Sequence, residues 1–418
     1  MREMKDSGIE WVGTIPAHWS TMPNKYVMRK IKVINPTYNG ENILSLTVNG
    51  VIVRDLEAGG KMPSSFDGYQ ILYKGNLLMC LFDYDVTPRC IGLIKDSGVS
   101  SPAYSQFVLQ RGNDAAYFYY YYLMVDHTKA LLHRAKNLRH SFTEEQLGAI
   151  KVPVPPIAEQ ERIADFLDSQ CSEIDAISAD IQKEIETLEQ YKRSVITEAV
   201  TKGLNPDAKT KKSTIFYMAP YNFEWRLSKI GYECTKLARP FSPADTPLLC
   251  TNKGKVSPRP SDMTGKMVSE DNAMQGIHKG DIAIHGMDTW HGAIAMSEYD
   301  GKITRVVHVC DSRQDKRFIV YYLQQLAFND VYKLISFGIR GNTSDFRSWD
   351  KVKDIYIALP DIDEQQKISD FLDLECRRVE DIVSEKKKQL DVLDAYKKSL
   401  IYEYVTGKKE VPLWNPNT

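Results

Sequence analysis

Two long stretches of the chain carry apolar residues at seven-residue spacing, and both predict long amphipathic helices. In the first stretch, an apolar residue recurs at every seventh position from Leu167 to Val195, with others three or four positions later. The second stretch repeats this pattern from Leu372 to Leu400, and Lys386 alone breaks it. Such spacing is typical of a coiled-coil seam, because every seventh residue returns to the same helix face. The predicted seam consists of Leu167, Ile174, Ile177, Ile181, Leu188, Val195, Leu372, Val379, Ile382, Leu393 and Leu400.

The two stretches are copies of one another. Glu159-Gln160 returns as Glu364-Gln365, and the same offset of 205 residues still relates Val200-Thr201 to Val405-Thr406. Helices of about 40 residues would be about 60 Å long, and neither could bury its apolar stripe alone. We therefore expect the two copies to pair with each other, and to run antiparallel because each is flanked by a globular block.

The blocks between the repeats read as strands and turns. Short alternating apolar runs at 43–48, 77–82, 105–109, 281–284 and 304–309 predict strands. An aromatic-rich helix is predicted at 117–132 and a counterpart at 318–334, which suggests one fold used twice with divergent loops. The expected fold is α+β: two mixed α/β domains on two antiparallel helices, in a pseudo-twofold repeat. The predicted segments are a domain at 1–155, a spacer helix at 156–203, a domain at 204–358, a spacer helix at 359–406 and a tail at 407–418.

Composition narrows the classes of protein without selecting one. The chain has 54 Lys and Arg against 55 Asp and Glu, so any basic surface must be local rather than global. Seven scattered cysteines without a Cys-x-x-Cys pair argue against a zinc site or a disulfide framework. The N-terminus does not look like a signal peptide, and the longest apolar run is too short for a membrane span. We therefore expect a cytoplasmic protein that does not bind a membrane.

Three segments together resemble the specificity subunit (HsdS) of type I restriction-modification enzymes. They are the N-terminal motif at 9–19, the segment at 155–160 that opens the first repeat, and the segment at 191–204 that closes it. The second block departs from the pattern, because Asn222-Phe223-Glu224-Trp225 is a poor echo of the N-terminal motif.

The resemblance implies two target-recognition domains, each reading half of a split sequence in double-stranded DNA, on helices that dock partner subunits. It implies no catalytic residue and no cofactor in this chain. Modification subunits, expected in two copies, would bind S-adenosylmethionine and methylate adenine, and restriction subunits would use ATP and Mg²⁺. The alternative is a coiled-coil scaffold that joins two protein-interaction modules without binding DNA.

Candidate DNA contacts cluster in a polar, cationic loop of each block, at 134–141 and 338–347. Arg and Asn side chains can read guanine and adenine in the major groove, whereas Ser, Thr and Lys suit phosphates. Other cations in the blocks are weaker candidates, since many would simply be solvated. The predicted contacts are Arg54, Lys61, Ser64, Arg89, Lys136, Asn137, Arg139, His140, Lys253, Lys255, Arg259, Arg305, Arg340, Asn342 and Arg347.

Two other motifs suggest chemistry that we consider improbable. Asn35-Pro36-Thr37-Tyr38 approaches an amino-methyltransferase loop, but Thr37 replaces the second proline and no Gly-rich cofactor loop accompanies it. His285, Asp288 and His291 could imitate a metal cluster, although three polar side chains at a strand end more often face solvent or DNA. We therefore predict no metal site and no active site in this chain.

Overall fold

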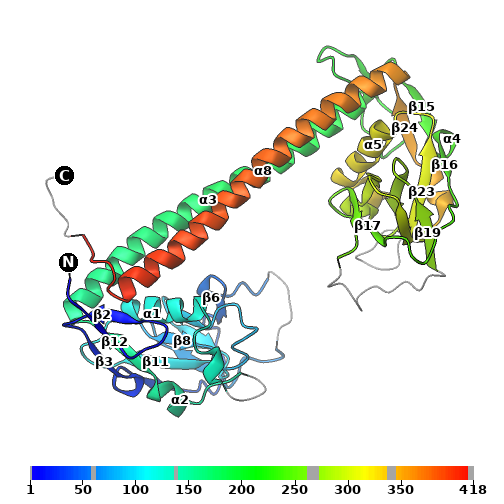
Figure 1. The fold of residues 1–418 in the computed structure, drawn as a ribbon. Coiled ribbons are helices and arrows are strands. Elements are labelled where there is room, and N and C mark those ends of the chain that lie inside the picture. Colours follow the sequence, from blue (N-terminus) through cyan, green and yellow to red (C-terminus); the bar gives the residue numbers. More distant parts are fainter. Residues whose placement is uncertain (1, 58–62, 136–139, 261–272, 337–344, 413–418) are drawn as a thin grey trace. The chain divides into compact units, whose positions relative to one another are not determined.

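The computed structural model describes residues 2–57, 63–135, 140–260, 273–336 and 345–412. The chain forms two compact units, and each is described by itself. The first unit comprises residues 1–181 with 388–418, and the second comprises residues 182–387. The boundary between them passes through both long helices, α3 (Ile157–Lys202) and α8 (Ile362–Val405), which therefore contribute to both units (Figure 1).

The first unit contains a four-stranded antiparallel sheet in the order β4-β11-β8-β9, flanked by smaller strand pairs and by α1. The strands are β1 (Met4–Asp6), β2 (Thr14–Pro16), β3 (Ser20–Pro23), β4 (Met28–Ile31), β5 (Leu44–Thr47), β6 (Gly50–Val53), β7 (Gln70–Leu72), β8 (Leu77–Met79), β9 (Ile91–Leu93), β10 (Gly98–Ser100), β11 (Ser105–Leu109) and β12 (Lys151–Val154). The helices are η1 (Asn24–Tyr26), α1 (Ala115–His127), η2 (Leu132–Arg134) and α2 (Glu144–Ala149).

The second unit contains a matching four-stranded sheet in the order β16-β23-β20-β21. Its strands are β13 (Thr210–Lys211), β14 (Tyr221–Asn222), β15 (Arg226–Lys229), β16 (Cys234–Lys236), β17 (Leu248–Thr251), β18 (Lys255–Pro258), β19 (Met274–Ile277), β20 (Ile282–His285), β21 (Ile294–Met296), β22 (Gly301–Thr304), β23 (Val307–Ser312) and β24 (Tyr356–Leu359). Its helices are α4 (Ile230–Glu233), η5 (Thr289–His291), α5 (Lys316–Phe328), α6 (Val331–Leu334) and α7 (Trp349–Lys353).

The two units share their topology strand for strand. Beside the matching sheets, the pairs β5–β6, β7–β10 and β3–β12 of the first unit recur as β17–β18, β19–β22 and β15–β24 in the second. The register corresponds too: Met79 lies opposite Ser105, and Ile284, 205 residues after Met79, lies opposite His308. The expectation of one α+β fold used twice, on two long helices that pack together, is therefore confirmed.

Each unit buries one end of the helix pair in its own core. The core of the first unit includes Leu167 from the start of α3 and Ile401 from the end of α8. The core of the second includes Ile196 from the end of α3 and Leu372 from the start of α8. The aromatic run on α1 is also core, with Tyr117 and its neighbours buried. The opposite chain directions within each unit show that the helices run antiparallel.

The seam between α3 and α8 follows the heptad pattern, with two corrections. Ile177 and Ile382, both predicted in the seam, are 43% and 38% exposed. Each comes three residues after a member of the seven-residue series, whereas the seam uses the fourth. One residue turns a helix by about 100°, so Ser178 and Val383 take the seam positions beside these two isoleucines. The other predicted seam residues are buried or half-buried: Leu167, Ile174, Ile181, Leu188, Val195, Leu372, Val379, Leu393 and Leu400.

All seven cysteines are buried and unpaired. Among the described residues, no helix is both long enough and apolar enough to cross a bilayer.

Candidate nucleic-acid interface

Gln160 fixes the start of α3 to the first block. Its side-chain oxygen accepts a hydrogen bond from the backbone N–H of Asp114 at 2.8 Å, and its Nε2 donates to the carbonyl of Pro155 at 2.8 Å. Asp114 is in turn the N-cap of α1, because its carboxylate accepts from the N–H of Tyr117 at 2.7 Å. One buried side chain therefore ties together the starts of two helices.

Gln365 makes the same connection in the second unit. Its oxygen accepts from the N–H of Asp315 at 3.1 Å, and its Nε2 donates to the carbonyl of Pro360 at 3.0 Å and to Oε1 of Gln314 at 2.8 Å. Asp315 caps α5 by accepting from the N–H of Phe318 at 2.9 Å. The repeated Glu-Gln pair thus has a structural reason: it mounts each block on the helix that follows it.

The glutamate of each pair binds a buried tryptophan. Trp19 Nε1 donates to Glu159 at 3.0 Å, and Trp225 Nε1 donates to Glu364 at 3.2 Å. The poor echo at 222–225 is therefore a true counterpart of the N-terminal motif in structure, with Trp225 in the place of Trp19. We call each set of Gln, Glu and Trp side chains a joint.

The two joints differ in charge. At Glu159 burial would raise the pKa, but hydrogen bonds from His18, Arg2 and Trp19 outweigh it, so that the pKa lies below its ordinary value. At Glu364 burial also acts first, Trp225 opposes it, and nearby carboxylates add repulsion, so that the pKa is raised. The charged carboxylate is thus stabilised by its partners in the first joint, whereas in the second joint burial and nearby carboxylates disfavour the charged form.

The end of the other long helix completes each joint. Gly407 follows α8 with φ +68°, and a Cβ placed there would lie 2.9 Å from the ring of Trp19. Gly203 follows α3 with φ +87°, and its Cβ would lie 2.9 Å from Glu364. Glycine is needed at both positions, because the left-handed backbone ends the helix where no side chain fits. The predicted end of the first helix near Gly203 agrees with this geometry.

The predicted DNA contacts in the first block have different surroundings. Arg89 is half-buried and bonded within its own block: Nη1 donates to the carbonyl of Val48 at 2.8 Å and Nε donates to that of Ile91 at 3.1 Å. His140 lies 3.1 Å from a carboxylate oxygen of Asp85. Ser64 is exposed and Arg54 is half-buried. The guanidinium of Arg89 therefore already bonds backbone carbonyls of its own block, which the sequence alone did not reveal.

The predicted contacts in the second block divide in the same way. Lys255 lies 2.9 Å from Glu380 of α8, and Arg305 donates from Nε to the carbonyl of Met274 at 3.0 Å. Lys253 and Arg347 are exposed, and Arg259 is half-buried. Six further predicted contacts lie outside the described residues: Lys61, Lys136, Asn137, Arg139, Arg340 and Asn342.

The motifs that suggested other chemistry have structural partners. Asn35 Nδ2 donates to Glu41 at 3.0 Å, within a turn where its amide is already used. His285 Nδ1 accepts from the backbone N–H of Asp288 at 3.1 Å and thereby closes the turn after β20. Among the described residues, no three His, Cys, Asp or Glu side chains are grouped as metal ligands would be.

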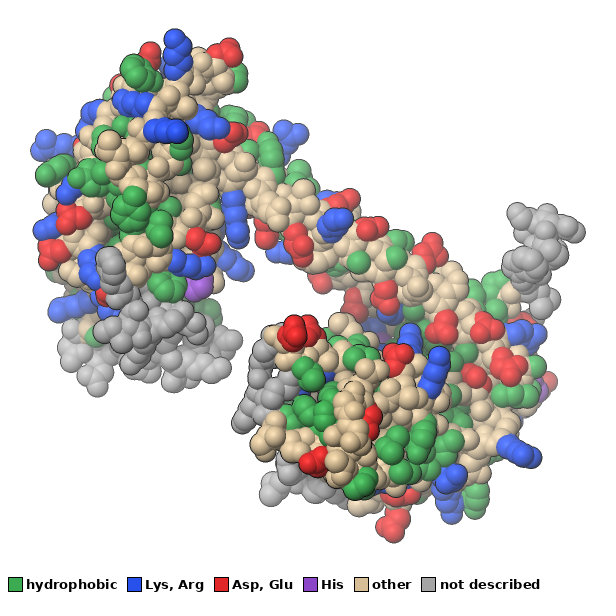
Figure 2. All heavy atoms as spheres, turned by 180° about the vertical axis from the view of Figure 1, so that it is seen from behind, with side chains coloured by type: hydrophobic (Ala, Val, Ile, Leu, Met, Phe, Trp, Pro, Cys, Tyr) green, Lys and Arg blue, Asp and Glu red, His purple; other side chains and the backbone are tan. Residues whose placement is uncertain are grey.

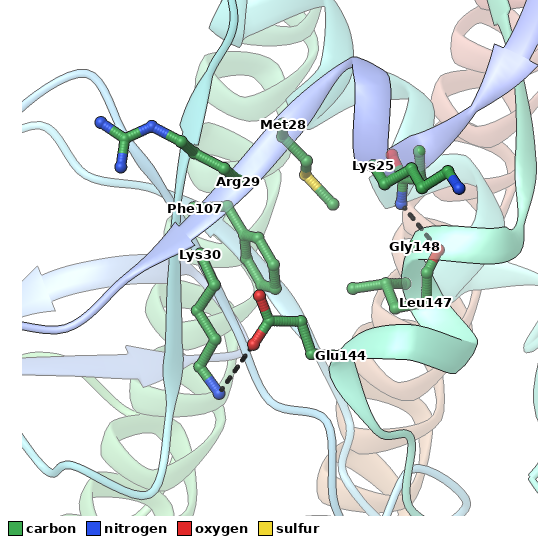
Figure 3. Close-up of a pocket in the computed structure, with 9 residues that line it drawn as sticks. Lys25, Met28, Arg29, Lys30, Phe107, Glu144, Leu147 and Gly148 are labelled. Carbon is green, nitrogen blue, oxygen red and sulfur yellow. Dashed lines mark hydrogen bonds and ion pairs between the residues drawn. The ribbon is translucent and has the colours of Figure 1, made fainter.

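Two hollows in the described part of the chain bear on ligand binding. The pocket in Figure 3 lies between β4 and α2, where Lys30 faces Glu144 at 4.0 Å, and its volume is about 120 Å³. Ligand pockets are usually about 300–1,000 Å³, so this hollow is too small to hold one. A groove of about 610 Å³ in the second unit lies along α3 and α8, and Lys253 and Lys255 line it. Because Glu380 in its wall pairs with Lys255, the groove already contains part of its own countercharge.

Sequence reasoning missed the residues that hold the predicted loops in place. Phe142 directly follows the first polar loop and Phe346 lies near the end of the second, and each is buried and bonded through its backbone to a residue at the end of a central strand. The signal was present in the sequence, because these phenylalanines lie 204 residues apart, one less than the offset of the helices.

Comparison with known proteins agrees with this architecture. Residues 65–187 match the family model described as type I restriction modification DNA specificity domain. A protein of Methanocaldococcus jannaschii, provisionally named the specificity subunit of type I restriction enzyme MjaX, is 25% identical over 304 residues, which are 68% of this chain. The alignment covers 64% of that relative.

A solved structure shares the fold at low sequence identity, and a second aligns more weakly. One, from a study of complex assembly and conformational transition of the type I R-M system, aligns with a TM-score of 0.67 at 14% identity and covers 94% of this chain and 99% of that one. The crystal structure of the HsdS subunit from Thermoanaerobacter tengcongensis aligns with a TM-score of 0.45 at 14% identity, over 94% and 98% of the two chains.

The fold and the joints together define a class of protein in which two similar blocks are mounted on two long helices that are copies of one another. Within that class, the chain is similar to the specificity subunits of type I restriction-modification enzymes, through the family model that matches residues 65–187 and the relative from Methanocaldococcus jannaschii.

Proposed function

We propose that the chain is the DNA-recognition subunit of a type I restriction-modification complex and that each unit reads one half of a split target. The observation that carries the proposal is the repeated joint. Two units of one topology, mounted by Gln160 and by Gln365, present different loops on the same frame. In such an arrangement the frame is shared and the loops hold the individual information.

The charge on one face of the molecule supports local reading rather than binding by a broad basic surface there. On the face shown in Figure 2, Lys and Arg are interspersed with Asp and Glu over the helices and both units. Base reading needs a few well-placed donors, whereas affinity comes from phosphate contacts. Among the predicted contacts, the exposed Ser64, Lys253 and Arg347 remain the best candidates in the described part of the chain.

The helices are proposed to dock the modification subunits. Ile177 and Ile382 are 43% and 38% exposed, and Tyr191 and Tyr396 are 50% and 52% exposed. Each pair is separated by 205 residues, so that an apolar surface on one copy recurs on the other. A partner that binds one such surface would find an equivalent surface at the other copy, which supports two modification subunits. S-adenosylmethionine, ATP and Mg²⁺ would be bound by partner subunits.

A methylome comparison tests the proposal. Genomic DNA from cells with and without the gene is sequenced for methylated adenine, in a strain with active partner subunits. We expect one gapped, two-part motif to lose methylation in the deletion. A chimera that replaces residues 1–155 with the corresponding block of another family member should change one half of the motif. An unaltered methylome in the deletion, or a chimera that alters both halves, contradicts the proposal.

The scaffold alternative makes a different prediction for the assembled complex. A scaffold that does not bind DNA would give no preference for any duplex. A recognition subunit should give specific binding whose affinity falls steeply with salt, because phosphate contacts release counterions. Filter binding of the reconstituted complex at several salt concentrations distinguishes the two.

A further inference from the structure

Phe346, near the end of the second polar loop, is held at three points. Its backbone N–H donates to the carbonyl of Gly286 at 3.0 Å, and its own carbonyl accepts from Nε2 of His308 at 2.7 Å. Its ring is 2% exposed and packs edge-on against Tyr332, with ring centroids 5.2 Å apart. Both backbone polar groups and the side chain are therefore fixed at one residue.

The contact with Gly286 is a close approach of two backbones. A Cβ at Gly286 would lie 2.7 Å from the carbonyl oxygen of Phe346 and 3.0 Å from Cα of Arg347. Atoms that close would have to move apart, and backbone atoms cannot swing away as the end of a side chain can. The strand end at Gly286 thus accepts the chain at 346–347 because glycine stands there.

His308 lies in the core of the sheet, on β23, and is 1% exposed. Since it bonds a carbonyl, Nε2 must be the protonated nitrogen, and Nδ1 is buried with no partner among the described residues. Burial first, and then the nearby charges of Lys236 and His285, lower the pKa of His308 against the opposing bond to Phe346. The side chain is therefore a neutral donor committed to one acceptor.

The first unit has the same anchor without the histidine. Phe142 donates from its backbone N–H to the carbonyl of Leu81 at 2.8 Å, and its ring packs edge-on against Tyr84 at 5.6 Å. Leu81 and Gly286 are 205 residues apart. Ser105 occupies the strand position of His308, since it lies opposite Met79 as His308 lies opposite Ile284. The added hydrogen bond is thus a property of the second unit.

We propose that His308 is a positioning residue for the half-site read by the second unit: by holding the carbonyl of Phe346 it orients the peptide that leads into Arg347. This inference rests on the proposed function. The carbonyl of Phe346 and the N–H of Arg347 belong to one rigid peptide plane, so fixing the oxygen fixes the direction in which Arg347 leaves the sheet. Arg347 is exposed, and an arginine that bonds guanine bidentately contributes a discrimination of about 1–3 kcal/mol, or roughly five- to 150-fold.

A second contact keeps the same stretch in place. The N–H of Asp345 donates to Oγ of Ser336 at 3.1 Å, which joins the residues on either side of 337–344. Asp345 also forms an ion pair with Lys351 of α7. Loss of the His308 bond should therefore loosen the peptide before Arg347 without releasing the whole segment, and the effect should fall on selectivity.

The test uses the full chain assembled with its modification subunits. Methylation is measured on a pool of duplexes in which each half-site is varied in turn. His308→Leu removes the donor, and His308→Gln replaces it with an amide that can still donate. We expect His308→Leu to reduce discrimination at one half-site about tenfold, with the other half-site unchanged, and His308→Gln to restore most of it. Ser105→Ala, at the corresponding strand position of the first unit, is the matched control and should leave discrimination at the half-site read by the second unit unchanged.

Two outcomes overturn the inference. One is that His308→Leu lowers methylation of all duplexes alike with every preference intact, as a merely structural residue would. The other concerns Arg347→Ala, the variant to measure if the His308→Leu complex does not assemble. If Arg347→Ala leaves all half-site preferences unchanged, Arg347 reads no base and His308 has nothing to position. A wild-type complex without any half-site preference would instead refute the proposed function itself, and the two failures are thereby distinguished.

Discussion

Replacing Gln365 with alanine tests whether the joint mounts the second block on α8. The side chain is fully buried and makes three hydrogen bonds, to the N–H of Asp315, the carbonyl of Pro360 and the amide of Gln314. Alanine would leave the half-buried N–H of Asp315 and the buried carbonyl of Pro360 without this partner, at up to about 1–3 kcal/mol each. Because Asp315 and Gln314 are half-buried and water can reach them in part, we expect a total loss of about 2–4 kcal/mol.

Hydrogen exchange measures this loss where it occurs. If local opening governs exchange at the start of α5, a loss of about 2–4 kcal/mol accelerates it roughly 30- to 900-fold. Gln366→Ala is the matched control, because Gln366 is exposed on the next position of the same helix. Surface changes of that kind usually stay within about 0.5 kcal/mol.

Gln365→Met separates the hydrogen bonds from the volume. Methionine nearly fills the space of glutamine but can neither donate nor accept in the same way. If the hydrogen bonds hold the joint, Gln365→Met should lose nearly as much as Gln365→Ala. The reasoning is refuted if Gln365→Ala and Gln366→Ala exchange alike, or if Gln365→Met is as stable as the natural protein.

Three further predictions concern the joints and the block surface. The lowered pKa of Glu159 gives the first joint a stability that is present above the ordinary value of 4.5 and is lost as the pH falls. The raised pKa of Glu364 gives the second joint a stability that is present at low pH and is lost as the pH rises. Hydrogen exchange at the two joints, measured from about pH 3 to about pH 6, should therefore show opposite trends. Gly407→Ala should lower the unfolding temperature of the first unit more than Gly112→Ala, since both have positive φ but nothing lies within 4 Å of a Cβ at Gly112. Arg89→Ala should destabilise the first unit by about 1–3 kcal/mol in denaturant and leave the salt dependence of DNA binding unchanged, because its guanidinium bonds backbone carbonyls rather than phosphates.

The periodic parts of the fold were predictable, and the reasons are physical. The heptad spacing of α3 and α8 reports a surface that must be buried, so it is written directly in the sequence. The strands were found where alternation was strong, as in β11, which spans Ser105–Leu109 as expected. Periodicity shows that one face of a helix is buried, but it does not fix to within one residue which positions face the partner helix. Ile177 and Ile382 were therefore predicted in the seam, whereas the next positions, Ser178 and Val383, occupy it.

The candidate site was less predictable, because the role of a polar side chain depends on contacts distant in sequence. Arg89 and Arg347 look alike in the sequence, yet one bonds the carbonyls of Val48 and Ile91 and the other is exposed. The anchor at Phe346 is made by residues 38 and 60 positions away, His308 and Gly286, and no local pattern marks them. Charge and residue type pointed to stretches of chain that stay a prediction, and they could not show that Arg89 is bonded to backbone carbonyls while Arg347 is exposed.

Charged residues that flank the seam favour one register of the helix pair. Lys192 lies 2.6 Å from Glu380 and Lys397 lies 2.6 Å from Asp175, and the two pairs are related by the same 205-residue offset. A slide of one helix by a single turn would break both of these ion pairs beside the apolar seam, although Glu380 also has Lys255 as a partner. Purely apolar seams tolerate such slides, whereas polar positions specify one register at some loss of stability.

Lys386 extends this argument to the position where the repeat is broken. Its partner is Glu184, whereas the repeat-related positions hold Ile181 and Gln389 and can form no ion pair. The symmetric pairs would be satisfied equally well by two identical helices, but the pair at Lys386 needs one helix of each sequence. The substitution of lysine for isoleucine thus costs apolar burial in one copy and favours pairing of α3 with α8 over pairing of either helix with a second copy of itself.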